Sequence, residues 1–206
     1  TTTSAMIAAL LDALGAEPSF IVGSTILALG TAARAGRPGG PFVIEADEYD
    51  HMFLGLQPDI AVITNVEWDH VDCYPNPEDF HRAFAQFASQ VRPGGAVLFC
   101  GDDPGSRSLH REAAARPDGA GGSSAQWISY GLETGNQWRA GNLQPSPAPP
   151  LDAGASGMEF DVWREDKLLG RVAIPLSGEH NVRNSLAALA ATTLAGHDLL
   201  SKLREN

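Results

Sequence analysis

The sequence is poor in positive charge, and this shortage limits the partners that the protein can have. Its 206 residues carry 14 Lys and Arg against 25 Asp and Glu, which gives a formal net charge of -11. Nucleic-acid binding needs a basic face, and the sequence contains no cluster of basic residues, so no nucleic-acid partner is expected. An anionic substrate would have to be bound by local groups or by metal ions.

Cysteines and long hydrophobic runs are also scarce. Two cysteines, Cys73 and Cys100, are too few for a disulfide framework and favour a reducing compartment. No apolar run approaches the roughly 18 residues of a membrane span, and the first residues lack the basic segment of a secretory signal. We therefore expect a soluble, cytoplasmic protein with no membrane partner, and its length predicts one main unit.

Helical and strand-like patterns alternate along the first part of the chain. Helices are expected over residues 4–14, 77–91 and 102–115, and short apolar strands over residues 19–24, 42–46, 60–65 and 96–100. A short helix or irregular turn is expected over residues 26–36. This order predicts an α/β fold with a mostly parallel, doubly wound sheet.

The pattern changes in the second part of the chain. Short runs with partial alternation between residues 136 and 176 predict a small antiparallel β appendage, interrupted by a low-complexity loop over residues 144–157. Glu165 and Asp166 stand where a hairpin turn would join the last two runs. A helix rich in Ala and Leu is expected from Gly178 to Gly196.

Polar residues follow two apolar strands between Phe42 and His70. Ligands bind at the carboxyl ends of parallel strands, so Glu45 and His70 are expected to face one crevice. Glu45 begins a run of carboxylates that is suited to Mg²⁺ but is also typical of a solvated loop. His70 is an unexpected Mg²⁺ ligand, and an ordinary hydrogen-bonded histidine is the alternative.

Two expected helices begin with polar side chains. The hydroxyls of Thr1 and Thr2 lie where a helix N-terminus attracts anions, although simple N-capping explains them equally. His180, Asn181 and Asn184 open the last helix. Capping accounts for Asn181 but less well for Asn184, and two amides on one face could bind the edge of a base such as adenine.

Four segments, TTTSAMIA, EADEYD, TNVEWDHVDCY and GEHNVRN, resemble in this order the signatures of the central, ATP-binding domain of the Mur ligases. The resemblance implies a P-loop NTPase-like fold and a ligase of peptidoglycan synthesis. It further implies that L-alanine is joined to UDP-N-acetylmuramic acid through an acyl phosphate. The segments are also similar to those of a murein-recycling relative that attaches a whole tripeptide, and a non-catalytic nucleotide-binding domain is a further alternative.

The resemblance also implies roles for individual residues, and these concern ATP, Mg²⁺ and the muramyl substrate. Thr1 would be a hydroxyl ligand of Mg²⁺, and Thr2 would lie beside the phosphates of ATP. The expected metal-binding and catalytic residues are Glu45 and His70. His180, Asn181 and Asn184 would lie at the adenine, and Asn65 would face the muramyl substrate.

Several parts of the family pattern are not found in the sequence. The glycines and lysine of the P-loop would precede Thr1, and the N-terminal and C-terminal domains of the family are also missing. We therefore expect residues 1–206 to be a central domain truncated at its N-terminus. Those missing domains are its expected partners, and the fragment is not expected to catalyse ligation alone.

Overall fold

The computed structural model describes residues 1–115, 125–146 and 157–197, and the chain divides into two compact units. Unit 1 comprises Thr1–Glu45 and Tyr130–Asn206, and unit 2 comprises Ala46–Ser129. The chain therefore crosses between the units twice, at Glu45 and at Ser129. Most of the expected low-complexity loop, residues 147–156, lies outside the described residues.

Unit 1 begins with a helix that covers one face of a three-stranded sheet. Helix α1 (Thr2–Ala13) is followed by β1 (Ser19–Ile26), β2 (Thr31–Arg34) and β3 (Phe42–Ile44). The strand order is β2-β1-β3, with β1 antiparallel to β2 and parallel to β3. Phe20 and Val43 pack with Ala8 and Leu11 of α1 in one buried cluster. This packing fixes the start of α1 beside the carboxyl ends of β1 and β3.

Of the short helix or irregular turn expected over residues 26–36, a turn is found at residues 27–30, whereas residues 31–34 form the strand β2. The N–H groups of Leu29 and Gly30 both donate to the carbonyl of Ile26, and Gly30 has φ +70°. This tight turn sends the chain back along β1. The backbone groups at the edge of β1 then favour strand pairing over a helix.

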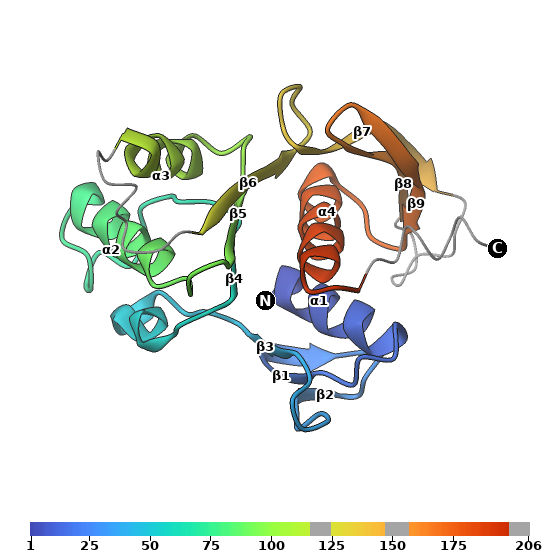
Figure 1. Cartoon of the computed structure of the whole chain (residues 1–206), viewed down its shortest axis with the longest axis horizontal. Coiled ribbons are helices and arrows are strands. Elements are labelled where there is room, and N and C mark those ends of the chain that lie inside the picture. Colours follow the sequence, from blue (N-terminus) through green and yellow to red (C-terminus); the bar gives the residue numbers. More distant parts are fainter. Residues whose placement is uncertain (116–124, 147–156, 198–206) are drawn as a thin grey trace. The chain divides into compact units, whose positions relative to one another are not determined.

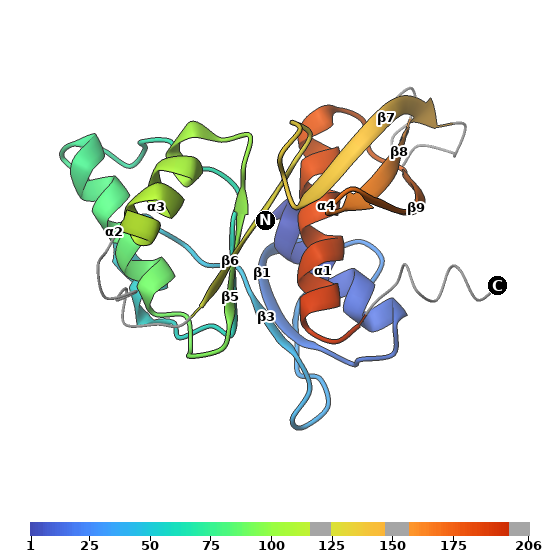
Figure 2. The same cartoon turned by 45° about the horizontal axis from the view of Figure 1, so that its top comes forward.

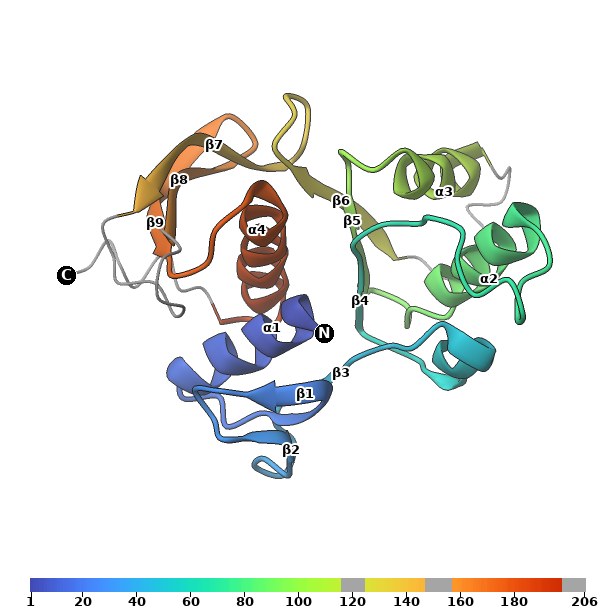
Figure 3. The same cartoon turned by 180° about the vertical axis from the view of Figure 1, so that it is seen from behind.

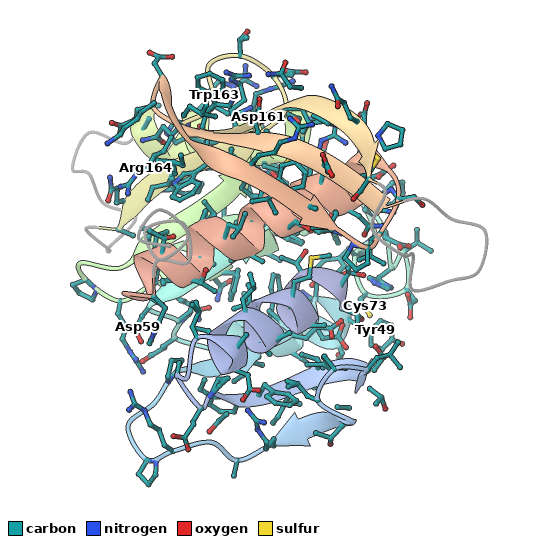
Figure 4. The ribbon with its side chains drawn as sticks, turned by 90° about the vertical axis from the view of Figure 1, so that its right-hand side faces the viewer. Tyr49, Asp59, Cys73, Asp161, Trp163 and Arg164 are labelled. Carbon is teal, nitrogen blue, oxygen red and sulfur yellow. The ribbon has the colours of Figure 1, made fainter. Side chains whose placement is uncertain are left out.

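The rest of unit 1 is the antiparallel part and the last helix. Strands β7 (Trp138–Ser146), β8 (Gly157–Arg164) and β9 (Lys167–Ile174) pair in antiparallel fashion, and α4 (Glu179–Leu194) follows. Trp163 and Arg164, near the end of β8, are labelled in Figure 4. Helix α4 contacts α1 on one side and β7 and β8 on the other, as Figure 3 shows. Its side chains are small, so α4 fits closely between these neighbours and is buried around most of its circumference.

Unit 2 is built on two parallel strands, β4 (Ile60–Ile63) and β5 (Ala96–Cys100). Helices α2 (Pro77–Ser89) and α3 (Pro104–Ala115) lie on the same side of these strands (Figures 1 and 2). A 3-10 helix, η1 (Tyr49–Gly55), contacts α2. All five residues of β5 are buried, as expected for a strand covered on both faces. Phe53, Tyr74 and Phe80 belong to one aromatic-rich core.

Strand β6 (Gln126–Gly131) carries the chain from unit 2 back into unit 1. It is part of a six-stranded sheet with the order β4-β5-β6-β7-β8-β9, in which β4–β5 and β6–β7 are parallel. The α/β fold class with parallel strands and a small antiparallel part is therefore confirmed, although the strands form two sheets. Among the described residues, no helix is long and apolar enough to cross a membrane.

The loop after β4 is attached to the beginning of α3. One carboxylate oxygen of Asp103 accepts hydrogen bonds from the N–H of Ser106 at 2.7 Å and from the N–H of Val66 at 3.0 Å. Gly105 lies directly against the Val66 backbone, so that a Cβ at this position would overlap the Val66 carbonyl oxygen and lie 2.8 Å from its Cβ. The start of α3 therefore fixes the backbone position of Val66, near the beginning of the loop over residues 64–70.

We predict that Gly105→Ala destabilises the protein by about 1–3 kcal/mol, because a methyl group would overlap the backbone of Val66. Helix propensity alone predicts the opposite sign, since Ala is favoured over Gly inside a helix. Denaturant titration measures the change in the free energy of unfolding. Gly55→Ala is the matched control in unit 2, because a Cβ at Gly55 has nothing within 4 Å. A stabilised Gly105→Ala variant would contradict this packing.

Candidate functional site

Glu45 follows β3 and holds the beginning of α1 against β1. Its backbone N–H donates to the carbonyl of Ile21 at 3.0 Å, which extends the parallel pairing by one residue. Its Oε1 accepts a hydrogen bond from the Thr1 hydroxyl at 2.6 Å, and its Oε2 accepts one from the Gly23 N–H at 2.5 Å. We call Thr1, Gly23 and Glu45 the carboxylate site.

Gly23 makes this close approach possible. A Cβ at this position would lie 3.0 Å from Oε2 of Glu45 and 3.1 Å from Oγ1 of Thr1. Both distances are shorter than ordinary contacts, so a side chain here would push the carboxylate away from the backbone N–H. The glycine therefore keeps the carboxylate close to β1.

The hydrogen bonds of the carboxylate site favour the charged form of Glu45. Partial burial acts in the opposite direction, but donation by the Thr1 hydroxyl and the Gly23 N–H lowers the pKa of Glu45 from its ordinary value of 4.5. Glu45 is therefore an anion at neutral pH. Its side chain is 26% exposed, so water reaches it.

The carboxylate site has donor atoms of the type that Mg²⁺ prefers. The Thr1 hydroxyl and the Glu45 carboxylate offer oxygen atoms only, and Mg²⁺ in proteins is commonly held by one or two such groups together with waters and substrate phosphates. No group of three or more His, Cys, Asp or Glu side chains within the described ranges could hold a metal ion. The chemistry of these residues thus fits Mg²⁺ held together with phosphate better than Mg²⁺ held by a protein cage.

The beginning of α4 is attached to α1 by a hydrogen bond between side chains. The Thr3 hydroxyl donates to Oδ1 of Asn184 at 3.1 Å. The amide of Asn181 instead donates to the carbonyl of Ser177 at 2.8 Å, which is a local helix-start contact. The His180 ring lies over Gly178, whose φ is +90°. Asn184 is therefore oriented by a residue of α1, whereas Asn181 has a structural partner near its own position.

Thr2 is the second residue of the hydroxyl-rich helix start. It is the first residue of α1 and is exposed. It stands beside Thr1 at the end of the helix where free N–H groups and the helix dipole favour an anion. Its position in unit 1 is thus adjacent to the carboxylate site.

His70 of unit 2 contacts a carboxylate of the run that follows β3. Its Nε2 lies 3.2 Å from Oε1 of Glu48, and both side chains are about one-third exposed. The ring of Tyr49 meets the imidazole edge-on, with 5.4 Å between ring centroids. His70 itself has φ +54°, a left-handed conformation that is uncommon for residues other than glycine.

Two tyrosines extend this group of residues. The hydroxyl of Tyr49, which is labelled in Figure 4, donates to Asp72 at 3.0 Å. This hydrogen bond raises the pKa of Tyr49 and lowers the pKa of Asp72. The hydroxyl of Tyr74 donates to the backbone carbonyl of Glu48 at 2.5 Å, and burial followed by the charge of Glu48 raises the pKa of Tyr74. Both tyrosines therefore stay protonated and act as donors at neutral pH.

Asn65 lines a cavity of about 460 Å³ in unit 2. Phenylalanines of the core form the apolar side of this cavity, and Glu48, Glu67 and Asp69 are among its acidic residues. The Thr64 hydroxyl donates to Oδ1 of Asn65 at 3.2 Å. Asn65 therefore stands where a ligand with both apolar and hydrogen-bonding groups could be bound.

The expected site residues fall into groups within each unit. Thr1 and Glu45 are in contact in unit 1, where Thr2, His180, Asn181 and Asn184 are also found; Asn65 and His70 belong to unit 2. The facing of Glu45 and His70 across one crevice stays a prediction. Sequence reasoning missed the partners Gly23, Thr3 and Glu48. Glu48 could have been predicted as a site residue, since it belongs to the carboxylate run. Nothing in the sequence around Gly23 indicates that it contacts Glu45.

We predict that the stabilisation from the carboxylate site depends on pH in the acidic range. The pKa of Glu45 is lowered on folding, so its contribution is complete above about pH 4.5 and is lost as the pH falls further. The pH dependence of the free energy of unfolding should therefore be weaker for Glu45→Gln than for the original chain. Thr1→Val should raise the pKa of Glu45, measured by carboxyl ¹³C NMR.

The matched control is Thr2→Val, because none of the hydrogen bonds of Glu45 comes from the Thr2 hydroxyl. This variant should leave the titration of Glu45 unchanged. A Glu45 carboxyl that titrates at or above 4.5 in the original chain would contradict the described hydrogen bonds.

Comparisons with known proteins agree with the arrangement of these elements. Residues 1–192 match the Mur ligase middle domain. The chain is 41% identical over 202 residues to a UDP-N-acetylmuramate--L-alanine ligase of Roseiflexus sp. (strain RS-1) and 42% identical over 211 residues to one of Chloroflexus aggregans. These alignments cover 95% and 97% of this chain but 42% of each relative.

A solved structure has the same fold. The UDP-N-acetylmuramate:L-alanyl-gamma-D-glutamyl-meso-diaminopimelate ligase from Neisseria meningitides superposes with a TM-score of 0.75 at 27% identity, over 96% of this chain and 59% of that one. The family match extends over most of the residues, including both groups of expected site residues. The chain therefore belongs to the Mur ligase family and corresponds to its middle domain.

Proposed function

We propose that the whole protein joins L-alanine to UDP-N-acetylmuramic acid at the expense of ATP, as a step of peptidoglycan synthesis. The observation that carries this proposal is the identity of 41–42% to relatives named UDP-N-acetylmuramate--L-alanine ligase. The chain spans less than half the length of these relatives. We propose that flanking domains bind the UDP group and the amino acid, and that the reaction takes place in the cytoplasm.

The proposed reaction proceeds in two steps. The carboxylate of UDP-N-acetylmuramic acid attacks the γ-phosphorus of ATP, which releases ADP and forms an acyl phosphate. The amine of L-alanine then attacks the acyl carbon, and phosphate leaves from the tetrahedral intermediate with one of the original carboxylate oxygens. Because the transferred group carries much negative charge, the protein mainly has to position the reactants and stabilise charge.

The carboxylate site suits the first of these steps. Thr1 and Glu45 would hold Mg²⁺, which when bound neutralises charge on the phosphates. Thr2 lies at the same helix start, where backbone N–H groups and the helix dipole favour a phosphate. The lowered pKa of Glu45 supports this role, because a metal ligand must stay ionised.

The beginning of α4 suits the adenine. The Thr3 hydroxyl donates to the side-chain carbonyl oxygen of Asn184. The amide N–H₂ of Asn184 would therefore donate to a ring nitrogen of the base. His180 supplies a ring that could stack, and Asn181 lies between them in the sequence. The contact of Asn181 with Ser177 suggests that it supports the helix start more than it contacts the base.

Unit 2 would hold the carboxylate end of the muramyl substrate. Asn65 lines the described cavity, and His70 follows on the same loop. We propose that His70 serves a second metal site where the transferred phosphate meets the substrate carboxylate. Glu45 and His70 are the two residues to which we assign catalytic roles.

A second candidate function is the attachment of a whole tripeptide. It is favoured by the structural similarity to the ligase from Neisseria meningitides, whose name specifies L-alanyl-gamma-D-glutamyl-meso-diaminopimelate. A non-catalytic nucleotide-binding domain is a third possibility. The proposed ATP-binding residues are compatible with all three functions, since each of these functions includes nucleotide binding.

We predict that the whole protein releases ADP and phosphate only when ATP, UDP-N-acetylmuramic acid and L-alanine are all present. Mass spectrometry of the product distinguishes L-alanine from the tripeptide. Residues 1–206 alone should form no product.

Glu45→Gln in the whole protein should lower kcat about 10²- to 10³-fold, because a neutral amide binds and orients Mg²⁺ poorly. Glu17→Gln is the control. Tripeptide addition alone would contradict the proposed substrate, and no ligation would contradict the enzyme.

We also predict that Asn184→Ala in the whole protein raises the KM for ATP about tenfold, which corresponds to the loss of about one good hydrogen bond. The kcat at saturating ATP should change little, since the adenine does not take part in the chemistry. Steady-state kinetics at varied ATP measures both. An unchanged KM would contradict the assignment of Asn184 to the adenine.

A further inference from the structure

Glu48 contacts His70, the histidine to which we assign a catalytic role. Its Oε1 lies 3.2 Å from Nε2 of His70. The two residues are 22 positions apart in the sequence, and both belong to unit 2. An ordinary surface ion pair of this kind contributes little to stability. The surrounding contacts, however, restrict both partners.

Two donors hold the backbone carbonyl of Glu48. The Tyr74 hydroxyl donates to its carbonyl oxygen at 2.5 Å, and the N–H of His51 donates to the same oxygen at 3.1 Å. Asp50 and His51 then adopt φ +49° and +57°. Tyr74 is completely buried. Glu48 therefore has a fixed backbone position next to the aromatic core.

His70 is restricted in the same way. The N–H groups of Cys73 and Tyr74 both donate to its carbonyl oxygen, at 2.8 and 2.9 Å. The backbone N–H of His70 donates to Oδ1 of Asp69 at 2.7 Å. The ring of Tyr49, whose hydroxyl is bonded to Asp72, covers the imidazole edge-on. The backbone of His70 is therefore held in place, and its imidazole is contacted by Glu48 and by the Tyr49 ring.

We infer that Glu48 is a positioning residue that fixes His70 as the tautomer with a proton on Nε2, so that Nδ1 presents a lone pair. An ionised carboxylate only accepts hydrogen bonds, so the nitrogen that faces it must carry the proton. In the neutral ring the other nitrogen is then an acceptor. Among the described residues, the hydrogen bond that the His70 ring makes is the one from Nε2 to Glu48.

This arrangement decides what kind of ligand His70 can serve. A lone pair on Nδ1 can coordinate a cation or accept a proton, but it cannot donate to a phosphate oxygen. A carboxylate on the outer N–H of a histidine is also the usual device that orients a metal-binding imidazole. The role in ligation rests on the proposed function, whereas the tautomer depends only on the contact with Glu48.

Histidine-selective ¹⁵N NMR of the chain tests the tautomer without any ligand or activity. At roughly pH 9, well above the ordinary histidine pKa, we expect ¹⁵N shifts of a protonated Nε2 and a bare Nδ1, with a visible Nε2–H signal. His70→Asn identifies the resonances. Glu48→Ala should abolish the visible N–H, because its proton would exchange freely with water. Glu48→Gln should retain it, because the amide oxygen also accepts.

Asp50→Asn is the matched control, since it removes the same charge two residues away without touching His70. It should leave the signal unchanged. A proton on Nδ1 in the original chain, or an unchanged signal in Glu48→Ala, would overturn the inference. If Glu48→Ala does not fold, the tautomer of the original chain and the Glu48→Gln spectrum decide the question.

The whole ligase provides the functional readout. Glu48→Ala should lower kcat about 10- to 100-fold, the usual cost of removing a group that orients a metal-binding histidine. Glu48→Gln should recover most of the loss. If the NMR signature is found but the whole protein has no ligase activity, the proposed function fails and the positioning by Glu48 stands. If ligation occurs with a proton on Nδ1, the positioning fails and the proposed function stands.

Discussion

Unit 1 depends on one carboxylate that accepts hydrogen bonds from two different elements. Glu45 receives the Thr1 hydroxyl from the beginning of α1 and the Gly23 N–H from β1, while its own backbone continues the pairing of β3. The cost of partly burying the charge is offset by these donors, so the carboxylate stays ionised. The same atoms that fix α1 to the sheet are thereby presented as oxygen ligands. Structure and proposed chemistry share one group of residues here.

Unit 2 follows a different principle, because the side chains to which we assign a function lie on irregular segments. The loop after β4 is held by Asp103 and Gly105 at the beginning of α3, and η1 is held by the hydroxyl of the buried Tyr74. Uncommon backbone conformations at Asp50, His51 and His70 persist because the surrounding packing enforces them. The aromatic core therefore holds these loop residues in fixed positions, as the proposed catalytic roles require.

The sequence predicted the elements better than the contacts between them. The all-apolar strand β5 and the Asn-capped helix α2 have strong local patterns, and both are found where expected. Glu45 was predictable because it follows an apolar strand. Its partner Gly23 was not, since only the register of β1 against β3 brings the two together. The strand β2 was missed because its Ala-rich sequence favours a helix, and pairing with β1 overrides that preference.

We propose above all that a protein containing this chain activates the carboxylate of UDP-N-acetylmuramic acid as an acyl phosphate. The most direct measurement uses this substrate with both carboxylate oxygens labelled by ¹⁸O, together with ATP and L-alanine. If the claim is correct, each turnover transfers one ¹⁸O atom to the released phosphate and retains one in the new amide. Phosphate released without ¹⁸O during amide formation would contradict it.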